Sequence, residues 1–446
     1  MGNIDAIFKA YDVRGLAPSE LDAELSRSIG AAFARFVADE NGATSIVLGH
    51  DMRPTGPEFS AAFAQGALSQ GVDVINIGLA STDMMYFASG TLDMPGAVFT
   101  ASHNPAGYNG IKMCLKGAAP LAGDTGLAVI KENARTLLEP QGAPGTMSER
   151  NLVEDFAQHV LGFIDVSELK PLKIVADTAN GMGGLVVPAV FAHLPFELEI
   201  MYEELDGTFP NHPADPLNEA NLVDLQRRVV EVGADVGLAF DGDADRVFLV
   251  DANADGVSGS LTTALVAEQV LKAEPGATIL HNLICSKVVP EIISEGGGTA
   301  VRTRVGHSFI KAVMAETGAA FGGEHSGHYY FRDNWRADSG MIAAVVILAA
   351  MCKADKPLHE LVEPLRRYRA SGEINTTVAD TAVVIDKVAA AYSDFDQDRM
   401  DGLTVDCGDW WFNLRPSNTE PLLRLNLEAA DEAAVAKRVE EVRSHF

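Results

Sequence analysis

Cysteine and basic residues are both scarce in this sequence. The four cysteines lie far apart, and no two of them form a CxxC pair. That spacing excludes the common zinc and redox motifs and favours reduced thiols in a cytoplasmic protein. Lysine and arginine together number 34 against 62 aspartates and glutamates, which gives a formal net charge of −28. Neither nucleic acid nor an anionic membrane is therefore expected as a main partner, because both attract basic surfaces.

Long apolar runs are also lacking, and the sequence predicts no leader. The longest apolar run, 341–352, is too short to span a bilayer and predicts a buried helix. The N-terminus has no basic region followed by an apolar stretch, so no signal peptide is predicted. We therefore expect a cytoplasmic protein without a membrane segment.

The chain does have enough apolar residues for a sizeable core. Of its 446 residues, 47% are hydrophobic and 22% are charged, which is typical of a globular protein with two to four domains. Buried strands are predicted within the stretches 44–53, 58–78, 172–184, 233–255 and 277–297, next to helical patterns. Strands that alternate with helices predict parallel βαβ units.

Turn-rich stretches at 139–149, 251–259 and 366–375 suggest where domains end. The last of the resulting segments is small and has two expected strands, 401–415 and 421–429, followed by a helix. We expect an α/β protein of three similar mixed-sheet domains and a smaller C-terminal α+β domain. The predicted boundaries are 1–147, 148–252, 253–366 and 367–446.

The first loop of interest is TASHNPAGYNGIK, residues 100–112. Ser102 and His103 follow a short buried strand and precede a Pro/Gly loop, where α/β proteins often place chemistry. A simple ST-turn or helix cap is the alternative for Ser102. Lys112 closes the loop, either as an ordinary surface lysine or as part of a site.

The second loop, DGDADR, carries Asp241, Asp243 and Asp245 between two apolar strands. Three carboxylates this close repel one another unless a cation lies among them, and oxygen ligands suit Mg²⁺ or Mn²⁺. An EF-hand is excluded, since Arg246 replaces the glycine at position 6 and Ala252 the glutamate at position 12. A solvated acidic turn is the alternative. A metal beside Arg246 would suit a phosphate, which Ser102 could carry.

Two further loops combine donors and acceptors. In GGEHSGHYY, Glu324 and Ser326 could grip vicinal hydroxyls, and His328 could transfer a proton. A Gly-rich turn with a capping serine is the alternative there. The loop RPSNTEP offers phosphate donors and resembles an anion nest, although a plain polar turn remains possible. Its donors are Arg415, Ser417, Asn418 and Thr419.

Two smaller features complete the set. Tyr11 and Arg14 lie near a glycine turn. His307 and Ser308 follow a glycine at an expected helix start, a place that accepts anions, although Ser308 could simply be a cap.

Taken in order, these four loops resemble those of the α-D-phosphohexomutase superfamily, in particular the phosphomannomutase/phosphoglucomutase group. TASHNP resembles its catalytic phosphoserine loop and DGDADR its metal loop. GEHSGH resembles its sugar-specificity loop, and RPSNTEP resembles its phosphate-binding loop. The resemblance covers nearly the whole chain and implies four domains around a central cleft, with one loop from each.

The resemblance also implies residue roles. Ser102 would be phosphorylated and would complete a Mg²⁺ site with Asp241, Asp243 and Asp245. Arg14 and Arg246 would stabilise the transferring group, and the acid/base candidates are Lys112, His307 and His328. Substrate binding would fall to Tyr11, His103, Glu324, Ser326, Arg415, Ser417, Asn418 and Thr419.

The implied reaction interconverts hexose 6-phosphate and hexose 1-phosphate through a hexose 1,6-bisphosphate. Small hexose phosphates would be the partners, and glucose or mannose 1,6-bisphosphate would be the activator. His325 occupies the variable position of the sugar loop, where glutamine goes with glucosamine phosphate, so mannose and glucose are favoured. We expect a monomer or a weak homodimer.

Three alternatives stay open at this point. Phosphoglucosamine mutase shares the mechanism, but His325 argues against it. A metal-dependent sugar phosphatase would transfer phosphate from Ser102 to water. The sugar loop argues against it, and so does a phosphate loop that must bind a phosphate from either end of the sugar. A non-catalytic sugar-phosphate binder would need neither Ser102 nor Arg246.

Overall fold

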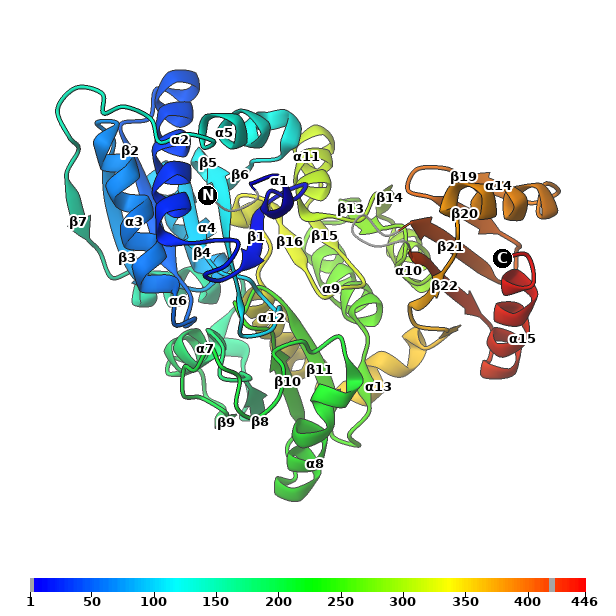
Figure 1. The fold of residues 1–446 in the computed structure, drawn as a ribbon. Coiled ribbons are helices and arrows are strands. Elements are labelled where there is room, and N and C mark those ends of the chain that lie inside the picture. Colours follow the sequence, from blue (N-terminus) through cyan, green and yellow to red (C-terminus); the bar gives the residue numbers. More distant parts are fainter. Residues whose placement is uncertain (1–3, 417–421) are drawn as a thin grey trace. The chain divides into compact units, whose positions relative to one another are not determined.

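The structure is a computed structural model that describes residues 4–416 and 422–446 (Figure 1). Two compact units emerge from its internal contacts. The first comprises Met1–Val257 with Ser326–His359, and the second comprises Ser258–His325 with Glu360–Phe446. Each unit contains two sheets or parts of sheets, and we describe each unit by itself.

A mixed sheet opens the first unit, with strand order β1-β5-β4-β2-β3-β7 and β6 paired to β5. Strand β2 runs parallel to β3 and β4, whereas β5 is antiparallel to β4 and β1. The strands are β1 (Val13–Leu16), β2 (Ser45–His50), β3 (Asp73–Leu79), β4 (Gly96–Phe99), β5 (Tyr108–Leu115), β6 (Ala119–Pro120) and β7 (Met147–Glu149). The helices are α1 (Ile4–Ile7), α2 (Ala23–Asn41), α3 (Gly56–Ser69), α4 (Thr82–Leu92) and α5 (Ala128–Asn133).

Helices α2 and α3 lie side by side next to β2 and β3 (Figure 1). They approach closely at two glycines. A Cβ atom on Gly30 would lie 2.1 Å from the Phe63 carbonyl oxygen, and one on Gly66 would lie 2.0 Å from that of Arg27. Their apolar faces build the core of this domain with Phe33, Phe63 and Phe99.

A second sheet in the first unit has the order β12-β11-β10-β8-β9. Parallel strands β8, β9 and β10 are joined by helices, while β10 and β11 form an antiparallel pair around the acidic loop. Its strands are β8 (Lys173–Asp177), β9 (Glu197–Met201), β10 (Val236–Phe240), β11 (Val247–Asp251) and β12 (Gly256–Val257). The helices of this part are α6 (Val153–Leu161), α7 (Gly183–Phe191), α8 (Val223–Val232) and the buried α12 (Gly340–Ala354).

The second unit begins with parallel strands in the order β14-β13-β15. They are β13 (Thr278–Asn282), β14 (Thr299–Thr303) and β15 (Phe321–Gly323). Helices α9 (Gly259–Ala273), α10 (Val288–Glu295) and α11 (His307–Thr317) accompany them. Strand β16 (Tyr329–Phe331) belongs to the first unit, and α13 (Leu358–Val362) spans the boundary between the units.

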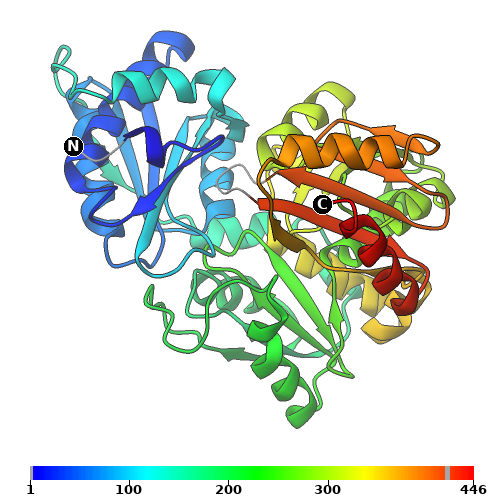
Figure 2. The ribbon, with the colours of Figure 1, turned by 45° about the vertical axis from the view of Figure 1, so that its right-hand side comes forward.

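A C-terminal sheet completes the second unit, with order β17-β22-β21-β20-β19 and β18 paired to β22. Helices α14 (Thr381–Ala391) and α15 (Glu432–Arg443) pack on this sheet (Figure 2). The strands are β17 (Arg369–Ala370), β18 (Ile374–Thr377), β19 (Asp396–Asp398), β20 (Leu403–Asp406), β21 (Trp411–Pro416) and β22 (Leu422–Ala429). A separate apolar cluster that includes Phe412 and Leu425 forms the core of this part.

Several expectations are confirmed and one is wrong. The apolar run 341–352 forms most of buried helix α12, and all four cysteines are free thiols. Within residues 4–416 and 422–446, no helix is both long and apolar enough to cross a bilayer. The stretch 401–415 is not one strand. It forms β20 and β21, because Gly408, at φ 90°, turns the chain back between them.

Candidate active site

Ser102 lies just beyond the carboxyl end of β4, in a tight turn where its backbone is left-handed. Its φ is 49°, in the left-handed region, and its side chain is buried. The Ser102 N–H donates to Thr100 Oγ1 at 2.9 Å, and the Ser102 hydroxyl donates to Asp241 Oδ2 at 2.8 Å. The turn therefore aims this hydroxyl at the acidic loop between β10 and β11.

The acidic loop holds a compact group of carboxylates. Oxygens of Asp241, Asp243 and Asp245 all lie within 4.8 Å of one another, and the three residues are buried. Lys112 Nζ donates to Asp243 Oδ2 at 2.7 Å and to Asp245 Oδ2 at 2.6 Å, while Thr82 Oγ1 donates to Asp243 Oδ2 at 2.5 Å. Lys112 is therefore a buried member of the site rather than a surface lysine.

The remaining oxygens of this group fit a divalent cation. Among the residues that the structure describes, the buried Oδ1 atoms of Asp243 and Asp245 have no hydrogen-bond partner. Buried carboxylate oxygens without a donor are costly unless a cation satisfies them. Oxygen donors of this kind suit Mg²⁺ or Mn²⁺, so the residues fit the metal that the sequence predicts.

Charge determines the ionisation of these groups. Burial opposes ionisation of Asp243, but the ammonium of Lys112 and the hydrogen bonds from Lys112 and Thr82 hold its pKa below the ordinary value. Burial raises the pKa of Asp241, against the effect of Arg246. Burial also disfavours the charge of Lys112, yet Asp243 and Asp245 raise its pKa well above the usual range. Lys112 is therefore a fixed positive charge at neutral pH.

Arg246 links the acidic loop to Ser102. Its Nε donates to Asp241 Oδ2 at 2.8 Å, and its terminal nitrogen lies 3.3 Å from Ser102 Oγ and 2.5 Å from His103 Nδ1. The positive charge of Arg246, together with burial, holds the pKa of His103 well below its usual range. His103 is therefore neutral and accepts a hydrogen bond from Arg246 through Nδ1.

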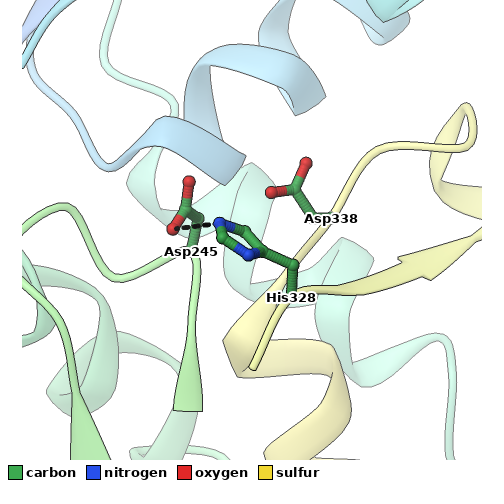
Figure 3. A group of neighbouring side chains, drawn as sticks. All are labelled: Asp245, His328 and Asp338. Atoms are coloured by element: carbon green, nitrogen blue, oxygen red, sulfur yellow. Dashed lines mark ion pairs between the residues drawn. The ribbon is translucent and has the colours of Figure 1, made fainter. Parts of the chain in front are cut away.

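His328 approaches the same carboxylates from another segment of the first unit. Its backbone pairs with that of Arg246 in an isolated bridge, and its Nδ1 lies 3.0 Å from Ser326 Oγ. Its Nε2 lies 3.8 Å from Asp245 Oδ1, and Asp338 completes a group in which the three side chains face one another (Figure 3). The ring is 21% exposed, so a substrate can reach it.

Arg14 lies on β1 next to the serine loop. Its two terminal nitrogens donate to Asn104 Oδ1 and to Asp12 Oδ2, both at 2.6 Å. Its side chain is 19% exposed, which leaves it accessible to an anion. Tyr11 precedes it and is half-buried.

The second unit carries the remaining predicted residues. Glu324 is buried, and its Oε1 accepts from Asn282 Nδ2 at 3.2 Å and from the Gly306 N–H at 3.1 Å. His325 Nδ1 lies 3.0 Å from Ser260 Oγ. Helix α11 begins at His307, as expected for a helix start, although the His307 side chain is outside the description.

The predicted phosphate loop is described only at its beginning. Arg415 is the penultimate residue of β21 and donates to Glu373 Oε2 at 3.1 Å. The predicted donors Ser417, Asn418 and Thr419 lie outside the described residues.

Sequence reasoning missed four buried charged residues around the serine and acidic loops, namely Asp51, Arg53, Asp83 and Asp338. Asp83 is completely buried, accepts from the hydroxyls of Ser81 and Ser339, and has its pKa raised to about 7 by burial. The sequence did show Asp51 and Arg53 in a charged loop after a buried strand. That position was the signal that could have found them.

A serine hydroxyl held among carboxylates that fit a divalent cation, with an arginine beside it, is typical of enzymes that transfer phosphoryl groups. Comparison with known families agrees with this class. Residues 5–139, 154–256 and 258–368 match the phosphoglucomutase/phosphomannomutase alpha/beta/alpha domains I, II and III. Residues 373–445 match the C-terminal domain of the same family.

Individual relatives give the same result. The chain is 40% identical over 442 residues to a protein of Xanthomonas campestris named phosphohexose mutases, with 98% of each chain covered. It is 40% identical to the phosphomannomutase of Escherichia coli K12, covering 95% of this chain and 94% of that one. A crystal structure of a phosphoglucomutase/phosphomannomutase family protein from Burkholderia thailandensis superposes with a TM-score of 0.91 at 32% identity, covering 100% and 97%.

The chain therefore belongs to the phosphoglucomutase/phosphomannomutase family. It is a phosphohexomutase, an isomerase of carbohydrate metabolism, and the resemblance and fold class predicted from its sequence are confirmed. Phosphoglucosamine mutase is only a distant alternative. The four domain boundaries and the individual site residues stay predictions.

Proposed function

We propose that this enzyme interconverts the 6-phosphates and 1-phosphates of mannose and glucose through a phosphoserine at Ser102. The observation that carries the proposal is the position of the Ser102 hydroxyl, 2.8 Å from Asp241 Oδ2 and 3.3 Å from Arg246. A phosphoryl group on this oxygen would lie among a metal-binding carboxylate group and a guanidinium. Both would neutralise its charge.

The reaction consists of two transfers. In the first, the bond between phosphorus and Ser102 Oγ breaks, and a hydroxyl oxygen of the sugar monophosphate forms the new bond and loses its proton. In the second, after the hexose 1,6-bisphosphate turns end over end, Ser102 Oγ bonds to the other phosphorus. The bond between that phosphorus and its sugar oxygen breaks, and the sugar oxygen gains a proton. Mg²⁺, when bound at Asp241, Asp243 and Asp245, would stabilise the negative charge on the transferred group.

The contacts of Lys112 and His328 support different tasks for the two residues. Lys112 Nζ donates to two carboxylates at once, 2.7 Å and 2.6 Å away, so we assign it to charge neutralisation. His328 is partly exposed and has its Nε2 beside Asp245, and we assign proton transfer with the sugar hydroxyl to it. His307 stays a second candidate for this role. Arg14, accessible on β1, would bind the transferring phosphoryl group.

Sugar recognition would fall to the loop around Glu324. Its carboxylate is held in place by Asn282 and by the N–H of Gly306, which pre-organises it for hydroxyl groups. Ser326 would take the neighbouring hydroxyl. Tyr11 and His103 would line the substrate site near Ser102. Relatives named phosphomannomutase, together with His325 at the variable position, favour mannose and glucose over glucosamine.

The phosphate that does not react would be bound by the loop from Arg415, with Ser417, Asn418 and Thr419 as further donors. Hexose phosphates are therefore the expected partners. Glucose or mannose 1,6-bisphosphate is the expected activator, because it can restore a phosphate to Ser102 once that phosphate is lost by hydrolysis.

A coupled assay tests this proposal. Mannose, glucose and glucosamine 1-phosphates are supplied separately with Mg²⁺ and a trace of glucose 1,6-bisphosphate. We expect turnover of the first two sugars by the wild type, and its loss in Ser102→Ala. Ser60→Ala is the matched control, because its buried hydroxyl donates to the Pro57 carbonyl within α3.

Two other outcomes would contradict the proposal. Release of free phosphate without isomerisation would mean a phosphatase. Preference for glucosamine 1-phosphate would mean that the sugar loop has been misinterpreted.

A further inference from the structure

Arg53 is a completely buried arginine in the loop between β2 and α3. The terminal nitrogens of its guanidinium donate hydrogen bonds to the loop 102–108. One terminal nitrogen donates to the carbonyl oxygens of Pro105 and Tyr108, both at 2.9 Å. The other donates to those of Ser102 at 2.8 Å and Asn104 at 2.7 Å. A single guanidinium thus bonds four carbonyls of the loop that carries the reactive serine.

Asp51 holds the beginning of the same loop. Its carboxylate accepts from the Arg53 N–H at 2.9 Å and forms an ion pair with Arg53 Nε at 3.3 Å. The Asp51 backbone N–H donates to the Phe99 carbonyl at 2.8 Å, directly before Thr100, whose Oγ1 accepts from the N–H of Ser102. The buried pair of Asp51 and Arg53 therefore fixes residues 100–108 from both ends.

The segment 207–209, which follows β9 in the second sheet of the first unit, packs against the Asp51–Arg53 pair. The guanidinium carbon of Arg53 lies 5.2 Å from the centre of the Phe209 ring. Gly207 packs so closely that a Cβ atom there would lie 2.6 Å from Arg53 Cα. Water is thereby kept from the guanidinium, which strengthens its hydrogen bonds to the carbonyls.

Stability alone does not explain such a residue. A buried ion pair contributes little net free energy compared with apolar residues of the same volume, because desolvating the charges is costly. What Arg53 does provide is a fixed direction for four carbonyl dipoles. A carbonyl oxygen that bonds Arg53 cannot also face the Ser102 hydroxyl, where its partial negative charge would repel a phosphoryl group.

We propose that Arg53 is a positioning residue for phosphoryl transfer, which holds the left-handed turn at Ser102 in register with Asp241 and turns the loop carbonyls away from the phosphoryl group. This inference rests on the phosphoserine role proposed for Ser102. A lysine cannot replace the guanidinium, because its single nitrogen lacks the planar fork that reaches four acceptors.

The test compares wild type with Arg53→Lys and Arg53→Gln, at a temperature where each is folded. We expect kcat to fall about 100-fold, as for a displacement of about 1 Å at a reacting atom, with KM for mannose 1-phosphate within about threefold of wild type. The ³¹P resonance of phosphorylated Ser102 should also shift. Phe33→Leu is the matched control, since it loosens the core of the same domain away from the loop.

Each outcome either supports or overturns the positioning role of Arg53. Lowered kcat with a shifted ³¹P signal in both Arg53 variants, and neither change in Phe33→Leu, supports the inference. A fall in melting temperature with unchanged kcat and an unchanged ³¹P signal would mean that Arg53 is only structural, and would overturn it. Wild-type enzyme that acquires no phosphate on Ser102 from glucose 1,6-bisphosphate would refute the phosphoserine role itself, and the inference with it.

Discussion

Lys112 sets the charge balance of the site. In the fully ionised site that a metal requires, the three buried aspartates carry three negative charges against the two positive charges of Lys112 and Arg246, which leaves one negative charge for the metal to balance. Lys112 also contacts two of the carboxylates that would bind the metal. Its ammonium therefore competes with the metal for Asp243 and Asp245 as well as neutralising them.

Lys112→Met tests this competition. We expect Mn²⁺ or Mg²⁺ to bind about tenfold more tightly, a change of about 1.4 kcal/mol, because a competing charge is removed. Turnover should fall, since a fixed charge near the phosphoryl group is lost. Titration calorimetry measures the first effect and the coupled assay the second. Lys116→Met is the matched control, because Lys116 is exposed and pairs with Asp93. Weaker metal binding in Lys112→Met would contradict competition.

His281, on β13, predicts a pH dependence of stability. Burial lowers its pKa to about 4, below the 6.5 of the unfolded chain. The unfolded state therefore binds this proton first as the pH falls, and stability is lost between about pH 6.5 and pH 4. The loss at pH 5 should be about 2 kcal/mol. Melting temperatures at pH 7 and pH 5 should differ less in His281→Gln than in wild type. Equal differences would contradict the assignment.

At the scale of elements, the crossing of α2 and α3 depends on two glycines. A methyl group at Gly30 would meet a backbone oxygen of α3 at 2.1 Å, and backbone cannot move aside as a flexible side chain can. Helices that approach this closely need small residues at the contact.

Gly30→Ala should therefore cost about 3 kcal/mol, the upper range for overpacking a core. A lowered thermal midpoint of the first domain would report it. Gly256→Ala provides the control, because a Cβ at that position meets no atom within 4 Å among the described residues other than its own chain neighbours. Similar midpoints for the two variants would show that the helices can separate without cost.

The elements that sequence patterns predicted well are the ones with local signals. Buried strands β2, β4 and β10 read as apolar runs, and the loops that follow them carry the residues of the site. The turn at Gly408 was missed because the apolar pattern continues on both sides of it. The partners of Lys112 and Arg53 could not be predicted, since these carboxylates and carbonyls lie far away in the sequence. No periodicity encodes such pairings.

At the scale of the whole molecule, the C-terminal part has its own apolar core. Its cluster includes residues from α14, α15 and the central strands of its sheet. Polar contacts join it to the rest of the second unit, where the Lys287 N–H donates to Glu428 at 2.9 Å and Lys287 Nζ donates to Asp406 at 2.8 Å.

We therefore expect residues 367–446 to fold alone, as the predicted boundary implies. Near-ultraviolet circular dichroism and a cooperative thermal transition would detect the fold. A fragment of residues 401–446 is the control, because it lacks α14 and also lacks β17 and β18, two of the three strands that pair with β22. If the longer fragment showed no cooperative transition, this part would depend on the rest of the unit and the boundary would not define a folding domain.

The whole account depends on one chemical event, the passage of a phosphate through Ser102. The most direct measurement is peptide mapping by mass spectrometry after incubation with glucose 1,6-bisphosphate, before and after a chase with mannose 1-phosphate. We predict one phosphate on Ser102 before the chase and its transfer to the sugar as a bisphosphate after it. Phosphate on another residue, or phosphate on Ser102 that the sugar cannot remove, would contradict the account.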